Sequence, residues 1–386
     1  MESRVRPVPA ARDPAAGRRS SWLELFFDLV FVVAVFQLGE LLNDDPSAGG
    51  VLVFAALLTT IWWLWFSFSY FADLFDNDRP PSRFVQLVAM LGVLALAASL
   101  DRGVADESGR FAVLYGLLLL LLTGMYGLVG WRRAAAREFC WWNAAGFVLG
   151  AALWFGSLLV PTPARYALWA VGLAVNAAVA GPLAYARAGQ APVQQSHMPE
   201  RFGLFTIVVL GEAVLAVANG IGETGWRPAA VVIGIGGFVI ACGIWWVYFA
   251  STFDPEAGNR AVRGGRAVVV RSYLYAYGHL LVYGSIVAAG VAVEVAAREA
   301  VHGGHGVAGP LLGGSQLTLM VGCVVVYRGF DVRVSRRVAL AQLGLVIAAL
   351  VIGLGGLPPV AVVLLVALAW VVLAVIEWTA PPVWRR

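Results

Sequence analysis

Long runs of apolar residues, separated by short polar segments, fill nearly the whole chain. A helix needs roughly 17–25 residues to cross the ~30 Å hydrocarbon core of a bilayer. Twelve runs reach about that length, which predicts an all-α, polytopic membrane protein with about 12 transmembrane helices. The predicted spans are 22–42, 51–72, 84–100, 111–131, 139–160, 166–186, 202–222, 229–252, 272–293, 309–327, 338–356 and 359–378.

The arginines of the chain alternate between the two sides of these spans. All 27 basic residues are arginine; 22 of them fall on the side of the N-terminus and 5 on the other side. Positively charged residues favour cytoplasmic loops, so both termini are predicted to be cytoplasmic. Adding or removing one helix would disrupt the alternation downstream of it. The pattern therefore supports the number of spans and predicts a multi-pass protein of an inner (cytoplasmic) membrane.

The two halves of the chain contain similar short motifs about 180 residues apart. Ile61-Trp62-Trp63 and Ile244-Trp245-Trp246 are both followed by further aromatic residues and by an aspartate. Because six is an even number, two six-helix halves would enter the membrane from the same side, as parallel repeats about an axis along the membrane normal. The tryptophans lie inside their spans, which favours helix packing over a place at the membrane interface. The predicted organisation is a disordered cytosolic tail (1–21), a first six-helix repeat (22–186), a cytosolic linker (187–201), a second six-helix repeat (202–378) and a cytosolic tail (379–386).

The amino-acid composition also indicates a membrane protein rather than a soluble one. Hydrophobic residues make up 60% of the chain without counting 44 glycines, and 13% of residues are charged. Soluble domains are roughly 45–50% apolar and about 25% charged. The net charge is +4, but the arginines are dispersed, which argues against nucleic acid as a partner. The three cysteines have no metal or disulfide spacing, and no nucleotide or enzyme motif occurs, so no cofactor is predicted.

Two carboxylates mark the first span. Glu24 and Asp28 are four residues apart and share one helix face near the predicted cytoplasmic end. Carboxylates this close repel each other, so one would keep a proton or both would need a cation. That arrangement suits a proton or cation site. The alternative is that Glu24 caps the helix N-terminus, where the macrodipole favours it, while Asp28 bonds a neighbouring helix.

Glu212 lies ten residues into the seventh predicted span, about 15 Å deep and close to the membrane midplane. Asn219 follows two turns later on the same face. Ionisable residues within a span usually face the protein interior and mark functional sites. Glu212 is therefore the strongest single candidate, against the alternative of a structural pair with a donor on another helix.

His279 in the ninth predicted span has Tyr275 and Tyr283 one turn on either side. This stripe could relay protons or partner Glu212 or Asp28, but a hydrogen-bonded core histidine explains it equally well.

Polar residues at the helix ends form a weaker group. His197, Glu200 and Arg201 precede the seventh span and could form a cytosolic gate, although holding the 6–7 loop is favoured. Asp73 and Asp254 are expected to pair with loop arginines. Glu40 and Glu294 fall at outer helix ends, where water can solvate them.

Two motifs carry a family resemblance. Trp22-Leu-Glu24-Leu-Phe26-Phe27-Asp28 and His197-Met-Pro-Glu200-Arg201, followed by Leu-Gly211-Glu212, resemble the bacterial low temperature requirement protein A family over nearly the whole chain. The resemblance implies a bacterial multi-pass membrane protein linked to growth in the cold. It does not supply a reaction.

The first motif also resembles the first-helix signature, with its Phe-Ser-Asp core, of potassium channels built from two six-helix repeats. In that family the helix lines the pore. Here Phe27 replaces the serine, and Ile207 stands where the second half would carry the aspartate. The resemblance implies a shared architecture rather than potassium selectivity.

Three functions follow as hypotheses. The leading one is a channel or secondary transporter for a cation, proton or small solute, with Asp28, Glu212, Glu24, His279 and Asn219 along the path. The second is a structural or regulatory protein for growth in the cold, without a transported ligand. The third is a membrane-embedded enzyme for a hydrophobic substrate. The expected partners are the lipid bilayer and the transported cation or small solute. The sequence leaves open whether copies of the chain form a homo-oligomer.

Overall fold

The computed structural model describes residues 21–75, 79–100, 104–184, 186, 197–249, 266–304, 306–330 and 334–379, and every regular element within them is helical. Twelve of the helices are long and apolar enough to cross a membrane, which confirms the predicted all-α class and number of spans. They are α1 (Trp22–Asp44), α2 (Ala48–Phe75), α3 (Pro80–Ala98), α4 (Val104–Arg132), α5 (Arg137–Gly156), α6 (Ala164–Ala178), α8 (Met198–Glu223), α9 (Pro228–Val247), α11 (Arg266–His302), α12 (Ala308–Phe330), α13 (Arg336–Leu354) and α14 (Pro359–Thr379).

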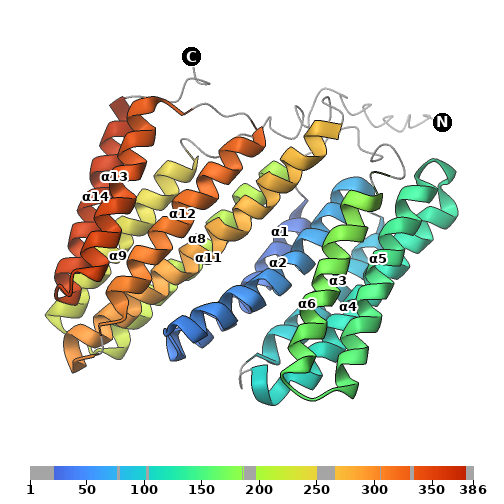
Figure 1. Cartoon of the computed structure of the whole chain (residues 1–386), viewed down its shortest axis with the longest axis horizontal. Helices are drawn as coiled ribbons and strands as arrows, with labels where there is room; N and C mark the ends of the chain where they lie inside the picture. Colours follow the sequence, from blue (N-terminus) through green and yellow to red (C-terminus); the bar gives the residue numbers. More distant parts are fainter. Residues whose placement is uncertain are drawn as a thin grey trace, which may run out of the picture.

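The helices form two groups that meet along a central seam (Figure 1). Helices α3 to α6 lie to the right in this view and α9, α12, α13 and α14 to the left, with α1, α2, α8 and α11 between them. Helix α1 packs against α2 and α3 in its own half and against α8 and α11 across the seam. We call the end of the bundle where α1 begins the inner end and the opposite end the outer end, following the predicted topology.

Several helix ends differ from the sequence prediction, and two of these differences bear on polar residues. Helix α8 begins at Met198, so residues 198–201 form its first turn rather than part of a linker. Proline in the first turn of α8 suits this start, since the first backbone N–H groups of a helix have no intrahelical partner. Helix α11 continues to His302, nine residues beyond the predicted end, which carries Glu294 and Arg298 inside the helix.

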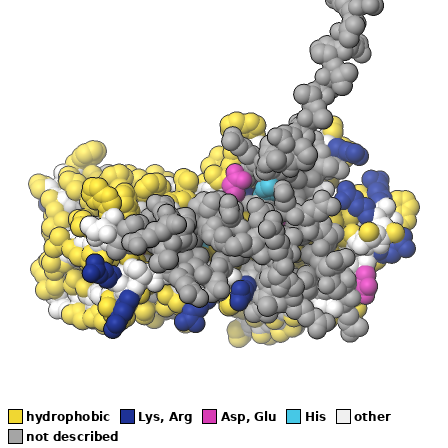
Figure 2. Space-filling view, turned by 90° about the horizontal axis from the view of Figure 1, so that it is seen from above, with side chains coloured by type: hydrophobic (Ala, Val, Ile, Leu, Met, Phe, Trp, Pro, Cys, Tyr) yellow, Lys and Arg dark blue, Asp and Glu magenta, His cyan; other side chains and the backbone are white. Residues whose placement is uncertain are grey.

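The outside of the bundle is apolar. Leu364, Leu368 and Val371 of α14 are 41–58% exposed, as expected for side chains that face lipid. Figure 2 looks onto the inner end: hydrophobic side chains surround the molecule, and arginines gather on this end, several of them over the side of α3 to α6. The described surface therefore has an apolar band that can face lipid and a charged end that can face water, as a membrane protein requires.

The tryptophan pairs of the two halves are placed differently. Trp62 and Trp63 are buried, as predicted, and stack near Tyr277 of α11. Trp245 and Trp246 are 48% and 38% exposed, so the prediction that they pack inside the bundle is wrong. Helix α9 instead turns a glycine face inward: a Cβ at Gly243 would lie 2.8 Å from the Trp370 ring of α14. The indoles of α9 are left partly exposed on the outside of the bundle.

Candidate transmembrane polar sites

Near the inner end, an ion pair joins the two halves of the molecule. Nη2 of Arg201 on α8 lies 2.6 Å from Oδ1 of Asp28 on α1, and both side chains are 2% exposed. The indole Nε1 of Trp65 on α2 donates to the same Oδ1 at 2.8 Å. Oδ2 of Asp28 and Nε of Arg201 are buried without a hydrogen-bond partner in the described part of the chain. We call Asp28, Trp65 and Arg201 the inner cluster.

Aromatic rings enclose the inner cluster. The Phe27 ring centroid is 5.8 Å from the guanidinium carbon of Arg201, within reach of a cation–π interaction. Trp65 stacks on Phe205 with centroids 4.5 Å apart and meets the edge of Phe202 at 5.2 Å. Rings exclude water, and an ion pair is stronger in such a low-dielectric site, although burying it costs desolvation.

His279 belongs to the adjacent aromatic layer. Its Nδ1 is 2.7 Å from the carbonyl oxygen of Tyr275 and its Nε2 is 2.8 Å from the Tyr248 hydroxyl. A carbonyl only accepts hydrogen bonds, so Nδ1 carries the proton and Nε2 accepts from the hydroxyl. The partner of His279 is thus Tyr248 of the α9 end, and not Glu212 or Asp28. This is the geometry of a hydrogen-bonded core histidine.

The remaining inner-end candidates hold helix termini. Ser21 N–H donates to Oε2 of Glu24 at 2.6 Å and the Ser21 hydroxyl accepts from Glu24 N–H, which is a capping box at the start of α1. The backbone N–H of His197 donates to Oδ1 of Asp73 at 2.7 Å, which ties the end of α2 to the start of α8. Glu200 is half-buried in the first turn of α8. Asp254 lies outside the described residues.

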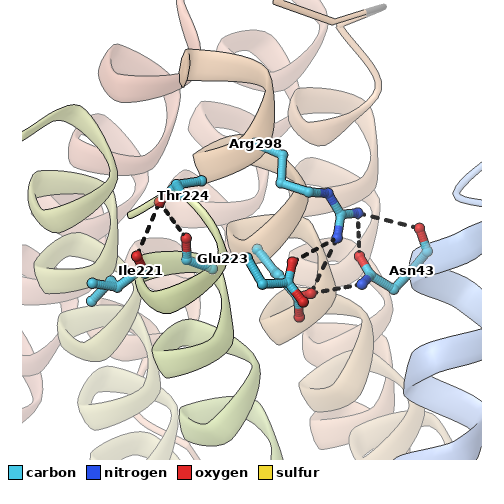
Figure 3. A network of polar contacts seen from close by, with 7 residues as sticks. Asn43, Ile221, Glu223, Thr224 and Arg298 are labelled. Carbon is cyan, nitrogen blue, oxygen red and sulfur yellow. Dashed lines mark hydrogen bonds and ion pairs between the residues drawn. The ribbon is translucent and has the colours of Figure 1, made fainter. Parts of the chain in front are cut away.

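A second polar cluster joins α1, α8 and α11 near the outer end (Figure 3). Oε1 of Glu294 accepts from Asn43 Nδ2 at 2.6 Å and from Arg298 Nη1 at 3.2 Å. Arg298 also donates to Oδ1 of Asn43 at 2.5 Å and lies 3.6 Å from a carboxylate oxygen of Glu223. We call Asn43, Glu223, Glu294 and Arg298 the outer cluster.

The prediction that Glu294 is solvated at a helix end is wrong. Its side chain is 2% exposed, because α11 continues for two more turns and α1 covers it. Arg298 is 33% exposed and Glu223 is 56% exposed, so water reaches the rest of the outer cluster. Among the described residues no group of three carboxylate, histidine or cysteine side chains is arranged to hold a metal ion.

Glu212 lies between the two clusters on the face of α8 that meets α1. It is 8% exposed, and a Cβ added to Gly39 of α1 would lie 3.8 Å from its Oε1. Glu40 and Glu294 are near enough to repel its charge. No hydrogen bond or ion pair of Glu212 is present in the described part of the chain. Asn219 is half-buried two turns further along α8.

Helices α1 and α8 run in the same direction and touch at two depths. Asp28 contacts Arg201, and Gly39 lies beside Glu212, so 11 residues separate the two levels on both helices. At 1.5 Å per residue the levels are about 16 Å apart. Asp28 and Glu212 therefore do not share one site. The convergence of carboxylates and His279 that a membrane-embedded enzyme would need is not present among the described residues.

Sequence reasoning missed several of these partners. The sequence pattern places Arg201 in the loop before the seventh span, and it does not predict the outer cluster. Two signals point to these partners: Arg201 falls in the first turn of a helix if Pro199 begins it, and Arg298 follows Glu294 at the i+4 spacing that favours a pair. Trp65 carries no local signal, since only the fold brings its indole to Asp28.

The fold and these clusters define a polytopic α-helical membrane protein whose halves are joined by charged residues inside the membrane. The chain belongs to the family of bacterial low temperature requirement A proteins, whose sequence model matches residues 19–378. It is 28% identical to an uncharacterized protein of Rhizobium meliloti (strain 1021) over 282 residues, which are 70% of this chain and 67% of that protein. No solved structure matches the chain.

Proposed function

We propose that the protein is a transporter of protons or a monovalent cation in the bacterial inner membrane, with Glu212 as the binding group midway along the path. The observation that carries this proposal is a buried carboxylate, at the seam between the two halves, that has no hydrogen-bond or ion-pair partner among the described residues. An ionised carboxylate in an apolar environment is strongly destabilised unless it is paired. Glu212 is therefore stable where it lies when it holds a proton or a cation.

The outer end of the seam offers a cation a route toward Glu212. Glu40, Asp44, Glu223 and Glu294 lie near the end of α1 together with Arg298, and their charges interact: Glu40 with Asp44, Glu223 and Arg298, and Glu294 with Glu40, Glu223 and Arg298. A region lined by one sign of charge raises the local concentration of the opposite ion. The described carboxylates form no group arranged to hold a metal ion, which favours a proton or a weakly coordinated monovalent cation over a divalent ion.

The inner end supplies a barrier. The Asp28–Arg201 pair lies among aromatic side chains, about 16 Å from the level of Glu212. A cation that leaves Glu212 for the inner end meets this closely packed pair, so passage requires the pair to rearrange. Exposure of one end at a time is the behaviour of a secondary transporter rather than an open pore.

The experiment is flux into proteoliposomes that contain the purified full chain and a pH-sensitive dye, with parallel Na⁺ and K⁺ gradients. We expect Glu212→Gln to abolish the flux and Glu212→Asp to keep part of it. Glu138→Gln, which neutralises an exposed carboxylate on α5, is the matched control and should retain wild-type flux. Absence of proton, Na⁺ and K⁺ flux in the wild type, or full flux in Glu212→Gln, would show that the proposal is wrong.

A structural role in cold growth is the second candidate, and the inner cluster favours it. A buried ion pair between α1 and α8 holds the halves together without any ligand. Under this alternative, growth of a deletion strain in the cold would be restored by Glu212→Gln as well as by the wild type. Under the transport proposal Glu212→Gln would not restore it.

A further inference from the structure

A pocket of about 270 Å³ lies at the inner end, where α1 and α3 begin and α2 and α4 end. Its walls are largely apolar and aromatic, with Phe27 of α1, Phe71 and Phe75 of α2, and Met125 and Leu128 of α4. At about 30 Å³ per water molecule, its volume equals that of roughly nine waters. A small head group with a few carbon atoms fits this space.

Arginine side chains from three helix ends line the same pocket. Arg79 comes from the start of α3, Arg132 and Arg133 from the end of α4, and Arg201 from α8. Arg201 is held by Asp28, and the guanidinium of Arg133 lies 5.9 Å from the Phe75 ring centroid. In the described part of the chain no ion pair joins Arg79, Arg132 or Arg133 to a carboxylate.

Among the described residues of the lining, Glu24 is the one carboxylate, and it accepts the Ser21 N–H in the capping box. The described lining thus carries more positive than negative charge beside its apolar walls. Guanidinium groups bind phosphate and carboxylate oxygens through paired hydrogen bonds, and phosphate is recognised by clusters of them. Apolar walls beside such a cluster favour a ligand whose anionic head continues into a hydrocarbon chain.

We propose that this pocket binds the phosphate head of an anionic amphiphile, with the first carbons of its tail against Phe71, Phe75 and Met125. The tail has an exit toward the membrane, because Leu128 lines the pocket and is 47% exposed on the outside of α4. Two sources share this chemistry: a phosphatidic acid of the membrane and a soluble alkyl phosphate. The pocket shares Phe27 and Arg201 with the inner cluster, but the assignment does not rest on the transport proposal, since its test measures binding and not flux.

The experiment is calorimetric titration of octyl phosphate into the full chain held in phosphatidylcholine nanodiscs. Arg132→Ala/Arg133→Ala should weaken binding about tenfold or more, because two charge-assisted contacts are lost. The control is Arg336→Ala/Arg337→Ala, which removes two exposed arginines at the same end but on α13. It should change the affinity less than twofold. Equal weakening by both double variants would reduce the effect to general surface charge and overturn the proposal.

Two further arms test the tail and the source. Met125→Trp fills the apolar part without changing any charge, and it should lower the affinity for octyl phosphate in a protein of unchanged melting temperature. Inorganic phosphate that binds as tightly as octyl phosphate would overturn the assignment of an amphiphile. Phosphatidic acid in the nanodisc that displaces octyl phosphate supports the membrane source, and binding that is unaffected by this lipid supports the soluble one.

Discussion

The seam formed by α1, α8 and α11 holds charged side chains in a different way at each of its two ends. The inner cluster matches one carboxylate to one guanidinium, encloses both in aromatic rings and leaves each side chain 2% exposed. The outer cluster shares one half-exposed guanidinium between Glu294 and Glu223. A matched, dry pair fixes the position of two helices, whereas an acidic, hydrated cluster attracts cations. The seam is therefore closed at its inner end, and its outer end attracts cations.

The largest expected effect is at the inner cluster. Asp28→Leu leaves Arg201 buried without a counter-charge, and we expect a loss of about 3–5 kcal/mol in the free energy of unfolding. Thermal unfolding followed by intrinsic fluorescence in nanodiscs measures it. The double variant Asp28→Leu/Arg201→Met should recover most of the loss, since an apolar pair of similar volume replaces both charges. A double variant as unstable as the single one would contradict the role of the inner cluster as a matched pair.

An intermediate effect is expected from Trp65→Phe. The ring still packs against Phe205, but Oδ1 of Asp28 loses a hydrogen bond from the indole. Hydrogen bonds to charged groups contribute about 1.5–3 kcal/mol, so the melting temperature should fall by less than in Asp28→Leu. Trp245→Phe, an exposed indole on α9, is the control and should change stability little. An equal fall in both would mean that loss of aromatic surface, rather than the bond to Asp28, sets the cost.

The smallest effect is expected at the outer cluster. Arg298→Ala removes contacts to Glu294, Asn43 and Glu223, but the guanidinium is 33% exposed, and such pairs contribute about 0–1 kcal/mol. Salt screens exposed charges within a Debye length of about 10 Å at 0.1 M. The difference in melting temperature between wild type and Arg298→Ala should therefore shrink as NaCl is raised. A cost as large and as salt-independent as that of Asp28→Leu would remove the contrast between the two ends.

The fold could be predicted from the sequence because hydrophobic length is a local property. Each of the twelve spans carries its own run of apolar residues, and no contact with another helix is needed to recognise it. Helix ends were less certain for a physical reason: the outer turns of α11 are polar, and Glu294 pairs with Arg298 inside the helix rather than ending it. The helical end was set by that pair and by Asn43, which lies 251 residues from Glu294 in the chain.

The candidate site was predictable in part. The carboxylates could be found because they are rare within apolar spans, and Glu212 is buried at the seam as its depth suggested. Their partners could not be found, since Asp28 and Arg201 are 173 residues apart and Trp65 comes from a third helix. The outward tryptophans of α9 show the same limit, because which face of an apolar helix turns inward depends on the neighbours it meets. The predicted parallel repeats and the topology remain predictions.

The identity of the base in the inner cluster has one last consequence. A guanidinium is not deprotonated in proteins, whereas a lysine can become neutral when it is buried. Of the two members of the Asp28–Arg201 pair, only the carboxylate can therefore change its charge. If the pair opens, a permanent cation stays inside the membrane, and the closed arrangement is the one with no net charge. The charge of Arg201 is therefore constant. Opening of the pair requires a change in the charge of Asp28 or an anion that takes the place of Asp28.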